Sequence, residues 1–132
     1  MRYIITWILL ILLLVGCRHD TTKPQQRLVG TWLVDIVTLD GGHFRSVITV
    51  APDGSYSCKF SKATTSGVLT GAIEGRYEIN RGTLIDTMTK HSNTNAVLPS
   101  VSRAQIIRLD DQELVTQCEG MTNEIVMRKE SR

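Results

Sequence analysis

Hydrophobic and polar residues divide the chain into three zones. Residues 3–16 form an apolar run that only Thr6 interrupts. Residues 18–27 contain one proline and no aliphatic or aromatic side chain, so this segment has nothing to bury in a core. From Leu28 onward, short runs rich in β-branched residues alternate with Gly, Asp and Asn, which is typical of strands joined by turns. The pattern therefore predicts a leading apolar segment, a flexible polar spacer and one folded domain.

The third zone predicts an all-β domain. No stretch of 11–18 residues shows the i, i+3, i+4, i+7 spacing of an amphipathic helix. Instead, apolar side chains recur at every second residue, as in Trp32, Val34 and Ile36, which places them on one face of a strand. Turn sequences such as Pro52-Asp53-Gly54 and Asn80-Arg81-Gly82 leave only short connections between consecutive strands. The predicted strands cover residues 30–39, 43–51, 55–62, 68–79, 83–91, 101–109, 112–119 and 123–129.

Eight strands linked by short hairpins favour a closed sheet. Because no helix is available to cover a face, closure into a barrel is the arrangement that leaves no strand edge unpaired. We therefore expect an all-β, eight-stranded antiparallel up-and-down β-barrel after an N-terminal signal segment. Such a barrel is just wide enough for side chains or one small ligand, and with strands this short we expect a mostly filled interior. Asp86, between Ile85 and Thr87, is expected to face outward.

The leading apolar run has the length of a secretion signal. Its 14 residues fall short of the about 20 needed to span a bilayer, and the basic residue Arg2 precedes it, as in a signal peptide. The run ends at Leu14-Val15-Gly16-Cys17, which resembles the bacterial lipobox. The resemblance implies cleavage after Gly16, a diacylglycerol thioether on Cys17, and acylation of the new amino group by a fatty acid such as palmitate. The alternative is an uncleaved signal anchor with an incidental cysteine.

This anchor predicts both the location and the domain boundaries. Two or three acyl chains make membrane attachment effectively permanent, whereas a single chain is marginal. Arg18, rather than an aspartate, follows the cysteine, and this resembles the sorting signal for the bacterial outer membrane. We therefore expect a lipid-anchored protein of the bacterial cell envelope, with a signal peptide at 1–16, the lipidated cysteine and tether at 17–27, and the barrel at 28–130.

Composition and charge exclude several function classes. The chain has 15 Lys and Arg against 13 Asp and Glu, and it has no basic stripe, so nucleic-acid binding is not expected. No Cys and His spacing is typical of a metal site. The sequence also lacks a nucleophile elbow, a Gly-rich phosphate loop and a patterned pair of carboxylates. We expect a non-enzymatic protein without cofactor or metal, and we expect its histidines to be solvated: His19, His43 and His91.

Several segments together resemble the lipocalins and the shorter bacterial lipocalin-like domains. Gly30-Thr31-Trp32 resembles the Gly-x-Trp motif that opens the first strand, and Pro52-Asp53-Gly54-Ser55-Tyr56 resembles a hairpin of the family. The resemblance implies that Trp32 plugs the closed end of the barrel and that Arg128 packs over its ring as a covering cation. It spans residues 28–130, and its remaining segments are residues 75–79, 107–114 and 125–128.

Two further cysteines, Cys58 and Cys118, lie in predicted strands of a protein that is expected to mature in an oxidising compartment. A disulfide between them would close a loop of about 60 residues and stabilise the fold by roughly 3–4 kcal/mol. The alternative is a pair of reduced thiols on different sides of the barrel, because neither strand has to neighbour the other in a meander. The sequence leaves both arrangements open.

Two functions fit such a barrel. In the first, a small apolar or amphipathic molecule binds in the barrel mouth. In the alternative, the barrel is filled and acts through its surface as a protein-interaction module of the envelope, such as an inhibitor or an assembly accessory, with contacts in the loops at 63–67 and 92–100. The side chains expected to line a ligand, or otherwise to form barrel core, are Trp32, Tyr56, Phe60, Tyr77 and Ile79.

Overall fold

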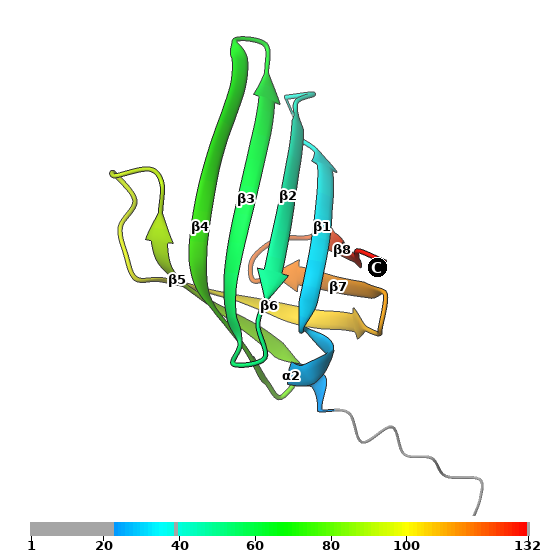
Figure 1. The fold of residues 1–132 in the computed structure, drawn as a ribbon. Coiled ribbons are helices and arrows are strands. Elements are labelled where there is room, and N and C mark those ends of the chain that lie inside the picture. The colour runs from blue at the N-terminus through cyan, green and yellow to red at the C-terminus, as the bar shows by residue number, and fades with distance from the viewer. Residues whose placement is uncertain (1–22, 39, 132) are drawn as a thin grey trace, which may run out of the picture.

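The computed structural model describes residues 23–38 and 40–131, so the expected signal segment and Cys17 lie outside the described residues. Each strand pairs with its sequence neighbours, and β1 also pairs with β8, which closes the barrel (Figure 1). The predicted all-β, antiparallel, up-and-down barrel is confirmed, and the strand ends differ from the expected ones by only one or two residues. The strands are β1 (Gly30–Val37), β2 (His43–Val50), β3 (Ser55–Thr64), β4 (Gly67–Asn80), β5 (Thr83–His91), β6 (Ser100–Leu109), β7 (Glu113–Cys118) and β8 (Glu124–Lys129).

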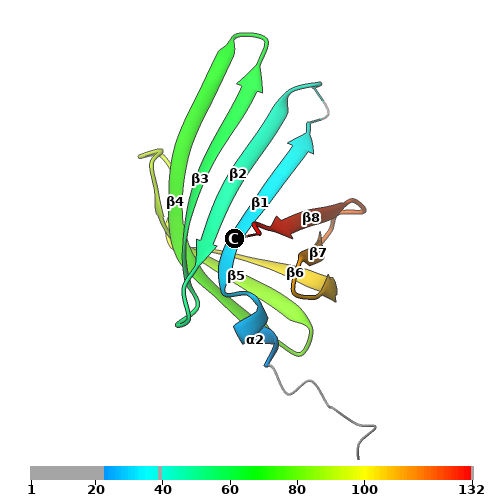
Figure 2. The ribbon, with the colours of Figure 1, turned by 45° about the vertical axis from the view of Figure 1, so that its right-hand side comes forward.

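The barrel is built from strands of unequal length, and this leaves one end open. β1 to β4 stand side by side as a tall curved sheet, while β5 to β8 run across its lower part (Figures 1 and 2). Thr89 of β5 has no register partner in β4, and Ile107 of β6 has none in β7; these extra residues mark β-bulges, which bend the strands that carry them. Since β4 has 14 residues and β7 and β8 have six each, the upper part of the tall sheet extends beyond the strands that face it.

The lower end of the barrel is sealed by the segment that leads into β1. Trp32 and Leu28 are each 1% exposed, and the Trp32 indole Nε1 donates a 2.7 Å hydrogen bond to the Leu28 carbonyl. A one-turn helix, α2 (Pro24–Arg27), precedes them, and its Gln25 side chain donates to the Tyr77 carbonyl and accepts from the Ile79 amide, both at 2.9 Å. Residues 24–27, which were expected to belong to the flexible spacer, are therefore part of the fold, because they form α2 and the Gln25 side chain pairs with strand backbone.

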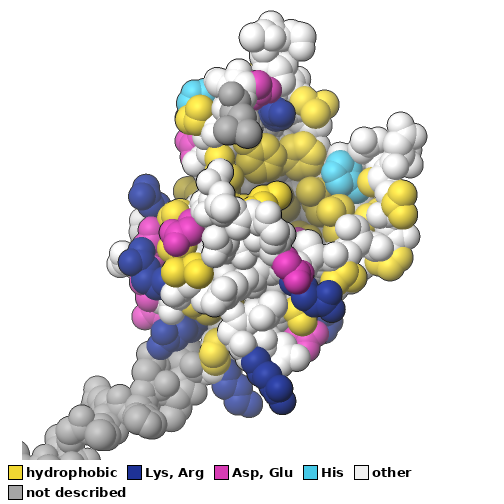
Figure 3. Space-filling model, turned by 180° about the vertical axis from the view of Figure 1, so that it is seen from behind, with side chains coloured by type: hydrophobic (Ala, Val, Ile, Leu, Met, Phe, Trp, Pro, Cys, Tyr) yellow, Lys and Arg dark blue, Asp and Glu magenta, His cyan; other side chains and the backbone are white. Residues whose placement is uncertain are grey.

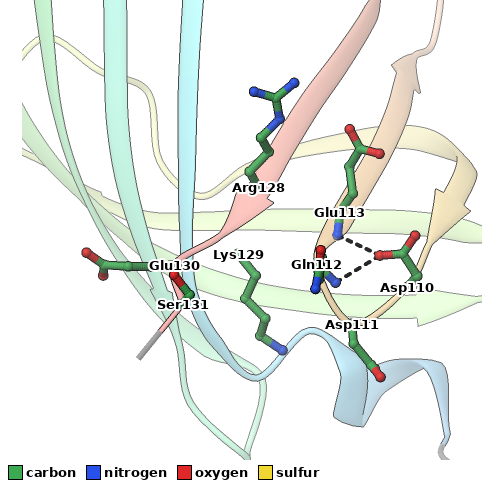
Figure 4. Close-up of a pocket in the computed structure, with 8 residues that line it drawn as sticks. All are labelled: Asp110, Asp111, Gln112, Glu113, Arg128, Lys129, Glu130 and Ser131. Atoms are coloured by element: carbon green, nitrogen blue, oxygen red, sulfur yellow. Dashed lines mark hydrogen bonds between the residues drawn. The ribbon is translucent and has the colours of Figure 1, made fainter.

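The cation over the Trp32 ring is Lys129, so the expectation that Arg128 fills this role is wrong. Lys129 Nζ lies 5.1 Å from the ring centroid and donates a 3.0 Å hydrogen bond to the Arg27 carbonyl. Arg128 is exposed and pairs in register with Leu33, which is also exposed on the outer face. Figure 4 shows the two side chains leaving β8 in opposite directions. Successive strand residues face opposite sides, so an error of one position exchanges inside for outside.

Of the two arrangements that the sequence left open for Cys58 and Cys118, the structure has the one with no disulfide, because both cysteines are free. Cys58 lies in β3 and Cys118 in β7, and four strand positions separate these strands in the closed order of eight. The two cysteines therefore stand on opposite walls of the barrel. The alternative of two reduced thiols on different sides of the barrel describes the structure.

Burial is graded along the barrel axis. Fully buried side chains concentrate toward the closed end, where Trp32, Leu28 and Leu114 are the largest. Toward the open end the inward-facing side chains, such as Ile36 and Ile73, are only partly buried against this core. Within the described part of the chain, no helix has both the length and the apolar character to cross a membrane.

Candidate functional site

The inner wall at the open end carries three ring side chains that contact one another. Phe44 in β2 stacks on Phe60 in β3 with ring centroids 5.9 Å apart, and the His91 ring in β5 lies 5.9 Å from Phe60 in a tilted arrangement. All three are half-buried. Seen from behind, hydrophobic side chains line a hollow between the upper part of the tall sheet and the β5–β6 loop (Figure 3). We call Phe44, Phe60 and His91 the mouth cluster.

Two glycines in β4 keep this hollow open. Gly71 is the register partner of Phe60, and Gly75 is the register partner of Tyr56. A Cβ at Gly71 would overlap the Phe60 ring, and one at Gly75 would overlap the Tyr56 ring and a backbone carbonyl of β5. Glycine in a strand marks a close approach of this kind. Because each ring lies flat over a glycine, it covers the wall rather than filling the centre of the barrel.

Below the mouth cluster lies a group of polar side chains that face inward. The Tyr56 and Tyr77 rings are stacked with centroids 4.2 Å apart, and the Tyr56 hydroxyl donates a 2.7 Å hydrogen bond to Asp86 Oδ1. Asp86 pairs in register with Tyr77, so both side chains share the inner face. The expectation that Asp86 faces outward is therefore wrong. Flanking residues do not decide the face of a strand, but its pairing with β4 does. We call Tyr56, Tyr77 and Asp86 the inner polar group.

Burial perturbs the protonation equilibria of this group. Desolvation raises the pKa of Asp86, and the hydrogen bond from Tyr56 opposes this effect. Desolvation, followed by the interaction with Asp86, raises the pKa of the Tyr56 hydroxyl, which therefore remains a neutral donor at physiological pH. Desolvation also raises the pKa values of Tyr77 and Cys58. Groups with perturbed pKa values inside a concave site are candidates for ligand contacts.

Asp86 is the partly exposed member of the inner polar group, and it pairs with β6. Asp86 pairs with Ser102 of β6, and Met88 pairs with Ser100, so these two serines share its inner face. Both serines are exposed. β7 ends at Cys118, which pairs with Ala104, so the part of β6 that carries the serines has no partner strand on that side among the described residues. Asp86 is therefore reachable from the open end over small hydroxyl side chains.

The structure brings together only some of the residues predicted to line a ligand. Tyr56, Phe60 and Tyr77 face the interior between the mouth and the middle of the barrel. Ile79 instead lies near the closed end, where its amide bonds to Gln25, and Trp32 seals that end. Reasoning from sequence missed three contributors: Phe44, Asp86 and His91. The one signal in the sequence was the pair of glycines within a strand, Gly71 and Gly75. Their aromatic partners, Phe60 and Tyr56, become apparent only from the pairing of β3 with β4.

The His91 ring departs from the expectation that the described histidines are solvated. Its neighbour on one side is Phe60, and its Nδ1 accepts a 2.8 Å hydrogen bond from the Asn93 amide. The latter contact holds the start of the β5–β6 loop against the mouth cluster. His43 is exposed, as expected. No group of three or more His, Cys, Asp or Glu that could hold a metal ion is found among residues 23–38 and 40–131.

A second hollow lies on the outside of the closed end. It is formed by the β6–β7 turn and the end of β8. It measures about 990 Å³, and the residues that line it are charged or polar (Figure 4). Its Asp110 carboxylate accepts hydrogen bonds from the amides of Gln112 and Glu113, which fixes the β6–β7 turn. Glu113 is paired with Arg108, and Lys129 serves the Trp32 plug. Three of its charged side chains, Asp110, Glu113 and Lys129, thus hold the fold.

The loops around the open end expose apolar side chains. Val68 and Leu69, just after the β3–β4 turn, are 70% and 62% exposed, and Val97 in the β5–β6 loop is 86% exposed. Val37 at the end of β1 and Met121 between β7 and β8 are also exposed. Apolar residues therefore occur around the entire rim of the mouth, in or beside each of its four connections.

Comparisons with known proteins support the fold. No protein-family model matches the chain, and no curated protein matches it in sequence. Among solved structures, a lipocalin-like protein from Bacteroides uniformis ATCC 8492 is 16% identical and superposes with a TM-score of 0.54, covering 79% of this chain and 99% of that one. A de novo designed fluorescence-activating β-barrel is 13% identical with a TM-score of 0.49, covering 84% of this chain and 100% of that one.

The fold is therefore a lipocalin-like, eight-stranded antiparallel β-barrel. At such low identity the likeness concerns the fold alone. What the chain binds has to be argued from its own mouth cluster and inner polar group.

Proposed function

We propose that the protein is a non-enzymatic binding module that takes up a small amphipathic molecule through the open end of its barrel. The observation that supports this best is the half-buried mouth cluster, on the side of the molecule where hydrophobic side chains line a hollow (Figure 3). Binding sites for small molecules are concave and largely apolar with a few polar groups. The mouth cluster supplies the apolar part of such a site and the inner polar group supplies the polar part.

We further propose that the protein is held at the bacterial envelope, at the outer membrane, by lipid on Cys17. The sequence Leu14-Val15-Gly16-Cys17 supports this proposal. The direction of the chain is compatible with it, because residue 23 enters the structure at the closed end, next to α2 (Figure 1).

A second candidate function is that of a protein-interaction module, and the exposed rim favours it. Val68, Leu69 and Val97 lie in or beside the loops expected to make such contacts. Exposed apolar patches mark interaction surfaces as well as ligand entrances. The two functions differ in whether a small molecule occupies the barrel.

Native mass spectrometry separates the two functions. The protein is produced in bacteria as a chain that starts at residue 18, which contains every element that closes the barrel, and it is purified without detergent. A small-molecule binder carries a reproducible extra mass that is lost on denaturation. A chain that is always bare, and that takes up no compound from an envelope lipid extract, contradicts the proposed function.

Two variants localise any bound mass. Phe60→Ala removes the central ring of the mouth cluster and should reduce the occupied fraction. Val47→Ala, a truncation on the outer face of β2 where Val47 is 45% exposed, should leave that fraction unchanged. If both variants or neither of them reduce occupancy, the ligand is not held at the mouth cluster.

The anchor is tested separately in the full chain. Cys17→Ala should accumulate as an unprocessed, unacylated precursor, whereas the parent chain should be recovered from the outer-membrane fraction with the mass of two or three acyl chains. Recovery of processed, acylated Cys17→Ala protein would show that another residue carries the anchor.

A further inference from the structure

Asp86 is a carboxylate inside the barrel with an incomplete set of partners. It lies on the inner face of β5, where the neighbouring position on that face, Leu84, is 5% exposed. Its Oδ1 accepts the hydrogen bond from Tyr56. Asp86 is partly buried, and a carboxylate partly removed from water gains from hydrogen bonds and from an opposite charge that offset the lost hydration. The Tyr56 hydroxyl supplies one of these hydrogen bonds and no positive charge.

No cation of the described residues pairs with Asp86. The ion pairs of the described residues join other carboxylates, such as Asp35 with Arg45 and Glu74 with Lys90, and these pairs are exposed. The groups that face Asp86 from neighbouring strands are Tyr56 and Cys58 of β3, Tyr77 of β4 and the serines of β6. None of them is positively charged at neutral pH, so the site has negative charge without a protein counter-ion.

The surroundings of Asp86 match a particular kind of cation. The Tyr56 hydroxyl holds one oxygen of the carboxylate, and an ammonium group that donates to the carboxylate forms a charge-assisted hydrogen bond, which is stronger than a bond between neutral groups. Toward the open end, the mouth cluster offers an apolar surface to whatever is attached to that ammonium. The serines of β6 leave a path from the solvent to the carboxylate.

We propose that the barrel binds a protonated amine on an apolar or aromatic body, with Asp86 as its counter-ion. This inference rests on the proposed function and names the chemical class of the ligand. The ammonium group donates to the Asp86 carboxylate, Tyr56 holds that carboxylate in place through its hydrogen bond, and the body of the ligand lies against the mouth cluster. Neutral and anionic molecules of the same shape lack the charge that the site requires.

The test uses three probes of matched size: 2-phenylethylamine, 2-phenylethanol and 3-phenylpropionate. Their affinities for the chain that starts at residue 18 are measured by NMR titration at pH 7, where the amine is protonated. The amine should bind at least about tenfold more tightly than the alcohol, because its hydrogen bonds are made to a charged group. The carboxylate probe should bind most weakly, since Asp86 repels it.

The variant Asp86→Asn should abolish this preference. The amide keeps the shape of the side chain and an oxygen that accepts from Tyr56, so amine affinity should fall about tenfold, to the level of the alcohol. Alcohol affinity should not change. Asp35→Asn is the matched control, because it removes the same charge from the exposed outer face of β1 and should leave all three affinities unaltered.

Acidification provides a second readout. Amine binding should weaken as the pH falls through the pKa of Asp86, and this pH dependence should be absent from Asp86→Asn. Equal binding of amine and alcohol, or an amine preference that survives in Asp86→Asn, overturns the inference while leaving the barrel as a binding module. If none of the probes binds and native mass spectrometry finds no ligand, the proposed function fails together with this inference.

Discussion

The closed end of the barrel provides the most direct test of what holds the fold together, through the replacement Trp32→Ala. Trp32 is 1% exposed, its indole N–H donates to the Leu28 carbonyl at 2.7 Å, and Lys129 Nζ lies 5.1 Å from its ring centroid. Truncating a fully buried aromatic side chain to alanine costs about 3–5 kcal/mol through lost burial and the cavity left behind. A domain of this size is stable by about 5–15 kcal/mol, so the variant should retain little reserve.

Two milder replacements measure separate contributions to the stability that Trp32 provides. Trp32→Phe keeps an aromatic ring beneath Lys129 but leaves the buried Leu28 carbonyl without its donor, which costs about 1–3 kcal/mol. Lys129→Met keeps most of the packing and removes the cation over the ring, a contact worth about 0.5–2 kcal/mol. Trp32→Ala should lower the free energy of unfolding most, and Trp32→Phe and Lys129→Met should each lower it less.

Urea denaturation followed by far-ultraviolet circular dichroism measures these free energies without relying on the tryptophan that is removed. Leu33→Ala is the matched control, because Leu33 is the next residue of β1 but is 40% exposed on the outer face. It should cost less than about 1 kcal/mol, as surface substitutions usually do. If Trp32→Ala costs no more than Leu33→Ala, the closed end does not depend on Trp32, and the account of the sealed base is refuted.

Three further predictions concern the interior. Gly75→Ala should destabilise the barrel by about 1–3 kcal/mol in the same urea assay, because the added Cβ overlaps backbone of β5; Gly71→Ala, which overlaps only side chains, should cost less, and the reverse order would contradict this packing. Asp86→Asn should raise the free energy of unfolding at pH 7, since burial raises the pKa of this carboxyl above its ordinary value of 3.8 and its ionised form therefore opposes folding. That gain should shrink as the pH falls through the raised pKa toward 3.8, and a gain equal at pH 7 and pH 4 would assign it to another cause. A thiol assay on the denatured chain that starts at residue 18 should find two reactive thiols, Cys58 and Cys118, and in the native protein the buried Cys58 should react more slowly; a mass 2 Da too low would reveal a disulfide.

The strands and their order could be predicted from sequence because their signals are local. Alternation such as Trp32, Val34 and Ile36 defines one face of a strand within a few residues, and turn residues define where each strand ends. Once eight consecutive strands are joined by short hairpins, few topologies remain, and the closed barrel leaves no edge exposed.

The interior of the barrel could not be predicted in the same way, because it depends on pairing between distant segments. The choice between Arg128 and Lys129 over Trp32 is set by the register of β8 on β1. The orientation of Asp86 is ambiguous from sequence, since Leu84 and Ile85 give β5 apolar residues on both faces, and only the pairing with Tyr77 decides it. Whether two cysteines meet likewise depends on where their strands fall around the closed sheet.

The distribution of stability along the barrel axis separates structural residues from functional ones. At the closed end, Trp32 and Leu28 are buried and joined by a hydrogen bond, and the half-buried Gln25 bonds to strand backbone, so each of them favours folding. Toward the open end the balance reverses, because Asp86 keeps a carboxylate without a cation of the described residues and Phe60 remains only half-buried. Side chains that lower stability without a packing gain are the ones that binding, rather than folding, explains. Under the proposed function, one bound amine would offset the cost of the Asp86 carboxylate and cover the exposed part of Phe60.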